Sequence, residues 1–255
     1  MTWKVINTGL QPAAWNMDFD KHLAEYAGAF DHLSILRLYG WNPHAISIGR
    51  NQSMDDFDLE NVRREGIDIV RRPTGGRAIL HAHELTYSVV TPCSSRNLKA
   101  IYRSINKGLL EGLRLLGIRA ALTDEGASSH ELYHQAVSIA CFSASARSEI
   151  QYEGRKLIGS AQRRYGGIVL QHGSLLLNTQ HRAIVNFLSP ILGDSKSRLE
   201  DRLSRYTIDA ETILDRSLSF DEAADAMVRG CARAWNVKFS SIEEPALSVA
   251  APSPI

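Results

Sequence analysis

Residues 71–81 read Arg-Arg-Pro-Thr-Gly-Gly-Arg-Ala-Ile-Leu-His and separate two stretches that are rich in β-forming residues. Adjacent glycines let backbone N–H groups approach a ligand closely. Arginine supplies paired hydrogen-bond donors for phosphate or carboxylate groups. A plain tight turn with solvated arginines has the same composition. The segment therefore predicts a glycine-rich turn between two strands, and composition alone favours the plain turn over a binding loop.

Strand-like segments lie on both sides of this turn. Residues 67–72 stop at Pro73, and residues 86–90 follow it. Residues 33–39 and 45–49 predict two earlier strands by their apolar and β-branched content. Further candidate strands are residues 138–142, 149–152, 156–159 and 168–177.

Helical periodicity is strongest at residues 98–117, where apolar residues recur at steps of three and four and Gly117 is a suitable stop. Ser219 followed by Glu222 fits a capping box that opens a helix running to about Trp235. A shorter helix is expected at 181–188. Strands followed by segregated helices predict an α+β fold.

The composition excludes several classes of protein. The chain has 255 residues and a formal net charge of +1, so a nucleic-acid binder that works by bulk positive charge is excluded. There is neither a signal peptide nor an apolar run long enough for a membrane helix. The cysteines Cys93, Cys141 and Cys231 lie far apart and form no CxxC pair. We expect reduced thiols in a soluble, cytoplasmic protein.

The domain organisation is expected to be simple. A chain of this length is typical of one large domain, which we place at residues 1–240. Residues 241–255 are rich in Pro, Ala and Ser, which predicts a flexible C-terminal tail.

Common catalytic motifs are absent from the sequence. It contains no Walker A motif, no GxGxxG between a strand and a helix, no HExxH and no GxSxG. His81 and His83 would share a face of a strand, but no third ligand is apparent, so no metal site is expected.

Two later segments place a chemically active residue among small ones. Residues 153–162 read Glu-Gly-Arg-Lys-Leu-Ile-Gly-Ser-Ala-Gln and contain Lys156, and residues 170–177 read Leu-Gln-His-Gly-Ser-Leu-Leu-Leu and contain His172. A lone lysine is usually a solvated charge, and a lone histidine is usually structural. Each of these segments is a weak signal when it is taken alone.

The three segments in this order resemble the biotin/lipoyl protein ligase superfamily, within which the chain is similar to lipoate–protein ligase A. The resemblance covers most of the chain, including residues 16–20 and 39–52. It implies a central mixed, largely antiparallel sheet flanked by helices. It also implies an enzyme that attaches an octanoyl or lipoyl group to a lysine of a lipoyl domain.

The resemblance also implies the residues of the site. Lys156 stands where the family has its invariant lysine, which contacts the acyl carbonyl. The residues expected to line the donor pocket or close over the acyl group are Arg72, Thr74, Gly75, Gly76, Arg77, His81, Gly159, Ser160, Ala161, Gln162 and Gly173. One departure is Ala82, where the family often has Asp after the histidine of the glycine-rich motif.

The branch of the superfamily is indicated by a cysteine. Ala140-Cys141-Phe142 stands where lipoate ligases carry an Asn-Asp pair, and the 72–77 motif is similar to that of the cysteine-dependent octanoyltransferases of Gram-positive bacteria. Without this context, Cys141 would more often be a packed core residue. Cys231 falls on the apolar stripe of the last helix and is expected in the core, and Cys93 is expected to be incidental. The resemblance implies Cys141 as the nucleophile.

The expected reaction uses octanoyl-acyl-carrier protein as donor and a lipoyl-domain protein, such as glycine cleavage H protein, as acceptor. Lys156 would favour the Cys141 thiolate, and His172 is a candidate general base. The thioester is already activated, so no cofactor is expected. Two alternative enzymes stay open: an ATP-dependent lipoate ligase, which would need ATP and Mg, and an amidotransferase between lipoyl proteins. A non-enzymatic acyl-protein binder is a third alternative.

Overall fold

The computed structural model describes residues 1–93, 98–122 and 149–242. Its strands are β1 (Thr2–Gln11), β2 (Leu33–Trp41), β3 (Ala45–Ile48), β4 (Asp68–Arg71), β5 (Ile79–His81), β6 (Glu84–Pro92), β7 (Ala121–Leu122), β8 (Ile150–Tyr152), β9 (Arg155–Tyr165), β10 (Ile168–Leu176) and β11 (Phe239–Ser241). Its helices are α1 (Ala13–Gly28), α2 (Leu59–Arg64), α3 (Leu98–Leu115), α4 (Ser195–Tyr206), α5 (Ala210–Leu214) and α6 (Phe220–Trp235), with 3-10 helices η4 (Thr179–Phe187) and η5 (Pro190–Leu192).

The strands form two sheets. The larger sheet has eight strands in the order β11-β1-β2-β6-β10-β9-β8-β7, and the smaller has three in the order β4-β3-β5. In the larger sheet, β1 runs parallel to β11 and β2, whereas the other neighbours are antiparallel. The predicted α+β fold with a mixed, largely antiparallel sheet is confirmed.

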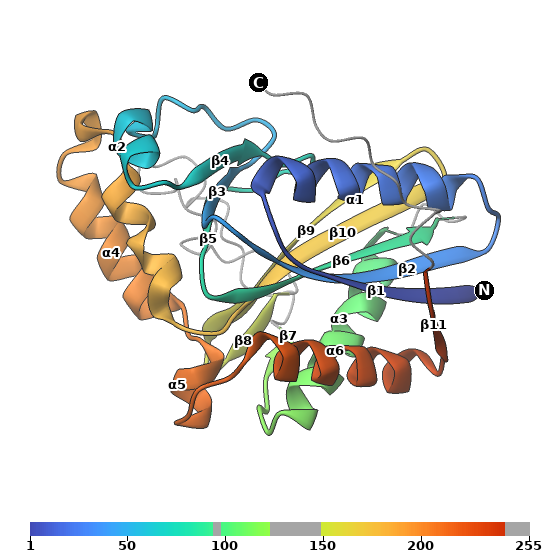
Figure 1. Cartoon of the computed structure of the whole chain (residues 1–255). Coiled ribbons are helices and arrows are strands. Elements are labelled where there is room, and N and C mark those ends of the chain that lie inside the picture. Colours follow the sequence, from blue (N-terminus) through green and yellow to red (C-terminus); the bar gives the residue numbers. More distant parts are fainter. Residues whose placement is uncertain (94–97, 123–148, 243–255) are drawn as a thin grey trace.

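Helices cover both faces of the larger sheet (Figure 1). On one face α1 packs over β2, β6 and β10, and on the other α3 packs against α6. The central strands are therefore buried on both faces, and every residue of β2 is buried. Gly112 and Gly230 let α3 and α6 cross closely, because a Cβ on Gly230 would lie 2.1 Å from the backbone nitrogen of Gly112.

The smaller sheet positions the glycine-rich turn. Strands β4 and β5 flank β3, and the turn formed by residues 72–78 connects β4 to β5. A short turn after β5 leads directly into β6 of the larger sheet. The chain thus passes from one sheet to the other within a few residues, which brings the turn next to the centre of the larger sheet.

Several elements differ from the sequence expectations. Strand β1 and helix α4 have no counterpart among the predicted elements, and the expected helix at 181–188 is the 3-10 helix η4. The expected strand at 138–142 lies outside the described residues. Ser241, which the sequence places in the tail, pairs with β1, and Ile242 belongs to an apolar core cluster under α1.

Candidate active site

A small cavity of about 40 Å³ lies between the two sheets. Its floor crosses four neighbouring strands of the larger sheet, from β2 through β6 and β10 to β9. The floor residues are Tyr39, Trp41, Thr86, Gly159, Ser160, Ala161, His172, Gly173 and Ser174. The remaining lining residues are Met17 on α1, Ser47 on β3, Arg72 after β4, and Ile79 and His81 on β5.

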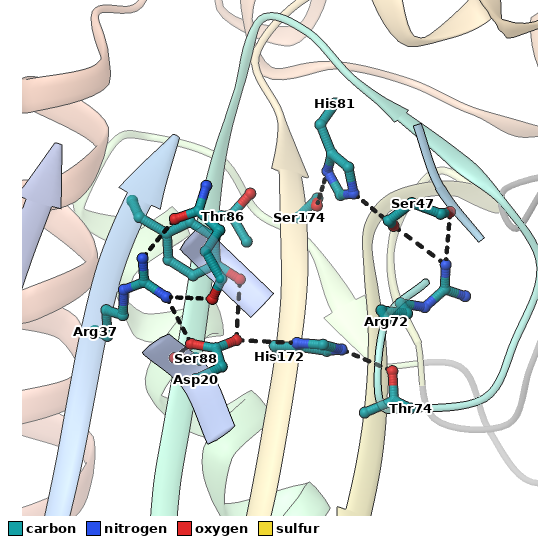
Figure 2. A network of polar contacts seen from close by, with 12 residues as sticks. Asp20, Arg37, Ser47, Arg72, Thr74, His81, Thr86, Ser88, His172 and Ser174 are labelled. Atoms are coloured by element: carbon teal, nitrogen blue, oxygen red, sulfur yellow. Dashed lines mark hydrogen bonds and ion pairs between the residues drawn. The ribbon is translucent and has the colours of Figure 1, made fainter. Parts of the chain in front are cut away.

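Asp20 on α1 organises one side of the cavity (Figure 2). Its Oδ1 accepts hydrogen bonds from Arg37 Nη1 and Ser88 Oγ, both at 2.8 Å, and its Oδ2 lies 3.2 Å from His172 Nδ1. The other ring nitrogen of His172 lies 2.7 Å from Thr74 Oγ1. A carboxylate, an imidazole and a hydroxyl thus form a continuous relay from α1 to the glycine-rich turn.

The charge state of Asp20 follows from its partners. Burial by itself raises the pKa of this carboxyl, but the Arg37 guanidinium and the hydrogen bonds from His172 and Ser88 outweigh burial and hold the pKa below its usual value. An ionised Asp20 can only accept hydrogen bonds, so His172 Nδ1 carries the hydrogen. In the neutral ring, Nε2 then accepts the hydrogen of Thr74.

A second relay of the same type lies nearer β2. His81 Nδ1 is 2.7 Å from Glu84 Oε1, and His81 Nε2 is 2.7 Å from Ser47 Oγ. Glu84 Oε1 also accepts hydrogen bonds from Thr86 and Ser174. Burial raises the pKa of Glu84, but His81 and these two hydroxyls outweigh burial and lower it.

Arg72 holds the glycine-rich turn. Its guanidinium donates to the carbonyl oxygens of Ser47, Gly75 and Arg77 at 2.9, 2.9 and 2.6 Å. Gly75 and Gly76 are exposed, and Arg77 is half-buried. Arg72 is therefore the residue of the predicted turn that lines the cavity, and Thr74 reaches the site through His172.

The part of the floor formed by β9 and β10 requires a glycine at position 173. A Cβ on Gly173 would lie 2.4 Å from the carbonyl oxygen of Gly159 and 2.8 Å from Ser160 Oγ. Ser160 is fixed by Tyr87, whose hydroxyl lies 2.7 Å from Ser160 Oγ. Gln162 instead donates to Gln171 at 3.2 Å and does not line the described cavity.

Lys156, Cys93 and Cys231 are not among the residues that line the cavity. Lys156 is buried at the start of β9 and forms an ion pair with Glu149. Cys141, the predicted nucleophile, lies outside the described residues. Cys231 is buried in the core as predicted, and burial raises the pKa of its thiol strongly. Cys93 is buried at the end of β6, so neither described cysteine reaches the cavity.

The histidine pair does not share a face. Strand β5 ends at His81, so His83 lies in the following turn, where it is exposed, while His81 is buried. Within residues 1–93, 98–122 and 149–242, no group of His, Cys, Asp or Glu is arranged to hold a metal ion. In the same ranges, no helix is long and apolar enough to cross a membrane.

Sequence reasoning missed the acids and hydroxyls that position the histidines. Asp20, Glu84, Ser47 and Ser88 were not singled out as site residues, although residues 16–20 and 84–88 belong to segments that carry the resemblance. Buried acids are rare unless they are paired. A carboxyl among the apolar positions of α1 was therefore the signal that could have identified Asp20.

Comparisons with known proteins agree on one family. The model of the lipoyl protein ligase A/B catalytic domain matches residues 12–232. Octanoyltransferase LipM of Symbiobacterium thermophilum is 40% identical over 235 residues, which cover 91% of this chain and 86% of the relative. Octanoyltransferase LipM of Geobacillus kaustophilus is 36% identical over 244 residues, covering 92% and 87%.

Solved structures show the same fold. A bipartite lipoate protein ligase of Thermoplasma acidophilum, solved in work that includes its E2 lipoyl domain, has a TM-score of 0.76 at 21% identity and covers 96% of this chain and 89% of its own. A putative lipoate protein ligase of the same organism with bound lipoic acid has a TM-score of 0.72 at 22% identity, covering 96% and 91%. At this identity the likeness concerns the fold alone.

Proposed function

The chain belongs to the lipoyl protein ligase A/B catalytic domain family, and we propose that it moves an octanoyl group from acyl-carrier protein, through a thioester on Cys141, to a lysine of a lipoyl domain. It is an acyltransferase that carries out octanoyl transfer in protein lipoylation. The observation that carries the assignment is the relationship to octanoyltransferases at 36–40% identity over nine-tenths of the chain. Among the finer steps, the role of His172 is supported by its place at the cavity and its contact with Asp20.

In the first step the Cys141 thiolate attacks the carbonyl carbon of the donor thioester. A bond forms from Cys141 Sγ to this carbon, the bond to the carrier sulfur breaks, and the carrier thiolate leaves and takes up a proton. An ordinary thiol has a pKa of about 8.5, so a nearby cation is needed to favour the thiolate. We assign this role to Lys156, which also stabilises the negative charge that develops on the carbonyl oxygen.

In the second step the amino group of the acceptor lysine attacks the acyl-cysteine. A C–N bond forms, the C–S bond breaks, and one proton must leave the nitrogen. His172 is the group we assign to take this proton at Nε2, because its Nδ1 faces the ionised Asp20. For this step the hydrogen bond that Nε2 accepts from Thr74 must be given up. Asp20 holds the ring in the tautomer that a base needs, as the third member of a catalytic triad does.

The identity of the nucleophile has indirect support. The chain has three cysteines, and Cys93 and Cys231 are both buried away from the cavity. The strongly raised pKa of the Cys231 thiol opposes formation of a thiolate there. Cys141 is the remaining cysteine, and it stands where the resembling transferases carry theirs.

The proposed reaction uses no cofactor. The donor thioester already contains an activated acyl group, so neither ATP nor Mg is required. Two octanoyltransferases are 36–40% identical to this chain over nine-tenths of its length, whereas two lipoate ligase structures are only 21–22% identical to it. We place the enzyme in the cytoplasm, where acyl-carrier protein and reduced thiols occur together.

The test is the intact-protein mass after mixing the enzyme with octanoyl-acyl-carrier protein, in the absence of ATP and acceptor. The expected result is an octanoyl adduct that hydroxylamine removes. The adduct should be absent in Cys141→Ala and present in the matched control Cys93→Ala.

Other outcomes separate the alternatives. An adduct that persists in Cys141→Ala contradicts the assigned nucleophile. If no adduct forms with the carrier protein but acylation occurs with ATP and lipoate, the enzyme is a ligase. If only an octanoylated lipoyl protein acts as donor, it is an amidotransferase.

A further inference from the structure

Lys156 and Glu149 form an ion pair in the interior. Their side chains are only 4% and 2% exposed, and Lys156 Nζ contacts Glu149 Oε1. Glu149 directly precedes β8, and Lys156 lies on β9, its antiparallel neighbour. The β8–β9 hairpin therefore brings the carboxylate to the lysine without any longer connection.

The pair lies close to the cavity. Lys156 is three residues before Gly159, which lines the cavity on the same strand, and three residues of strand span roughly 10 Å. Lys156 is not among the lining residues, but it stands on the strand that carries Gly159, Ser160 and Ala161 of the lining. On the proposed function, the reacting end of the acyl group lies toward this end of β9.

Among the described residues around the pair, Tyr102, Thr207 and His181 are neutral at pH 7. Burial raises the pKa of Tyr102 on α3, the Glu149 carboxylate raises it further, and the Lys156 ammonium opposes that rise. Thr207, after α4, bridges to the backbone of Lys156. His181 on η4 lies 2.9 Å from Thr207, and burial lowers its pKa to about 4. On β9 itself, Arg155 turns toward Glu153 in the β8–β9 turn.

A lysine in such a place depends on its counter-charge. Removal from water disfavours the ammonium. The pKa of a buried lysine without an acid beside it can fall to about 5 to 6. A neutral amine neither favours a thiolate nor stabilises an oxyanion by its charge. The ammonium has three N–H donors, and an acid that accepts one of them restricts where the others point.

We infer that Glu149 is a positioning residue for acyl transfer, which keeps Lys156 as the ammonium and orients its N–H groups toward the carbonyl oxygen of the acyl group. The inference rests on the proposed function of Lys156. Glu149 itself touches neither the acyl group nor the thiol, and no bond to it forms or breaks during the reaction.

The experiment compares Glu149→Gln, which keeps the shape and removes the charge, with Glu149→Asp, which keeps the charge on a shorter side chain. Asp225→Asn is the matched control, because Asp225 pairs with Arg229 on the surface. The rate of octanoyl-Cys141 formation is followed by intact mass from about pH 6 to about pH 10, below the ordinary lysine pKa of about 10.4. Thermal melting establishes that each variant is folded.

The expected result is a loss of about 10²-fold in acylation rate for Glu149→Gln at pH 7. In the pH profile of the Glu149→Gln acylation rate, the alkaline fall should shift to lower pH by more than about one unit, because a lysine without its carboxylate loses its proton at lower pH. Glu149→Asp should keep most of the acylation rate, and its rate should fall at the same alkaline pH as that of the wild type. The surface control should match the wild type in both readouts.

Each remaining outcome has one meaning. If Glu149→Gln acylates at the wild-type rate with an unchanged alkaline limb, the inference is wrong. If the rate falls but the limb stays, Glu149 has a structural role only, and the inference is again wrong. If the wild type forms no adduct, the proposed function fails instead.

If Glu149→Gln does not fold, the Nζ chemical shift of Lys156 is titrated by NMR in Glu149→Asp and in the wild type. If Glu149→Asp acylates slowly while its Lys156 has the same pKa as in the wild type, the inference is wrong.

Discussion

Two relays of the same form, Asp20–His172–Thr74 and Glu84–His81–Ser47, stand on two sides of one cavity and differ in what balances the acid. Asp20 faces Arg37, and both side chains are fully buried. Glu84 is held by His81 and two hydroxyls, and its Oε2 has no hydrogen-bond partner among the described residues. In the first relay a guanidinium balances the acid, whereas in the second the acid is held by an imidazole and two hydroxyls.

The relays also differ in how close they lie to β9, the strand that carries Lys156. His172 lies on β10 and is paired with Ala161 on β9, the strand that carries Lys156. His81 stacks on Trp41 of β2 with ring centroids 4.0 Å apart. Strand β2 is separated from β9 by β6 and β10. If the proposed function holds, the same motif serves the reaction in one place and supports the cavity lining in another.

The largest effect is expected from Arg37→Met. This change leaves the Asp20 carboxylate buried without its guanidinium, and breaking a buried pair from one side costs about 3–5 kcal/mol. Urea denaturation should show this loss in the free energy of unfolding. Arg229→Met, which breaks an exposed pair, is the control and should change little. If Arg37→Met lowers the free energy of unfolding no more than the control does, the buried ion pair does not set the Asp20 relay apart from the Glu84 relay.

The next effect concerns the reaction and compares His172→Gln with His81→Gln. We expect His172→Gln to slow transfer from acyl-Cys141 to the acceptor by about 10²-fold, or about 2.7 kcal/mol, because the base is lost. Formation of acyl-Cys141 should be much less affected, and His81→Gln should slow the acceptor step only slightly. Single-turnover mass spectrometry separates the two steps. Equal losses in both variants would show that the relays share the proton transfer.

The smallest effect is expected from Glu84→Gln, which should lower the free energy of unfolding by about 2 kcal/mol near pH 7 through lost charge-assisted hydrogen bonds. The pKa of Glu84 is lower in the folded state than its ordinary value of 4.5. Between these two pKa values the unfolded chain therefore binds more protons than the folded protein. The stabilisation is present above pH 4.5 and is lost as the pH falls toward the folded pKa.

The difference between wild type and Glu84→Gln should therefore shrink as the pH falls below 4.5. Denaturation curves at a series of pH values measure it. A difference that is constant down to acid pH would mean that Glu84 is not the ionised member of its relay.

Prediction from the sequence was most accurate where one local pattern was sufficient. The periodicity at 98–117 predicted α3 (Leu98–Leu115), and the capping box at Ser219 predicted the start of α6, where Ser219 accepts from the backbone N–H of Glu222. It was less accurate for α1, which was indicated only by the resemblance at residues 16–20, because the buried face of this helix contains Asn16 and Asp20 among apolar residues. Those polar residues are buried only because Arg37 and His172 meet them from distant strands.

The sequence by itself determined helices α3 and α6, the glycine-rich turn, the three motif segments and the family that they resemble, since these depend on neighbours in the chain. Only the tertiary structure decided which residues form the cavity wall and how their charges are balanced. Asp20 and His172 are 152 positions apart, and Thr74 and His172 are 98 apart. Their contacts exist because α1, β10 and the turn after β4 pack around one cavity. The reach of a hydrogen bond is short, so such partners are chosen by packing and not by spacing along the chain.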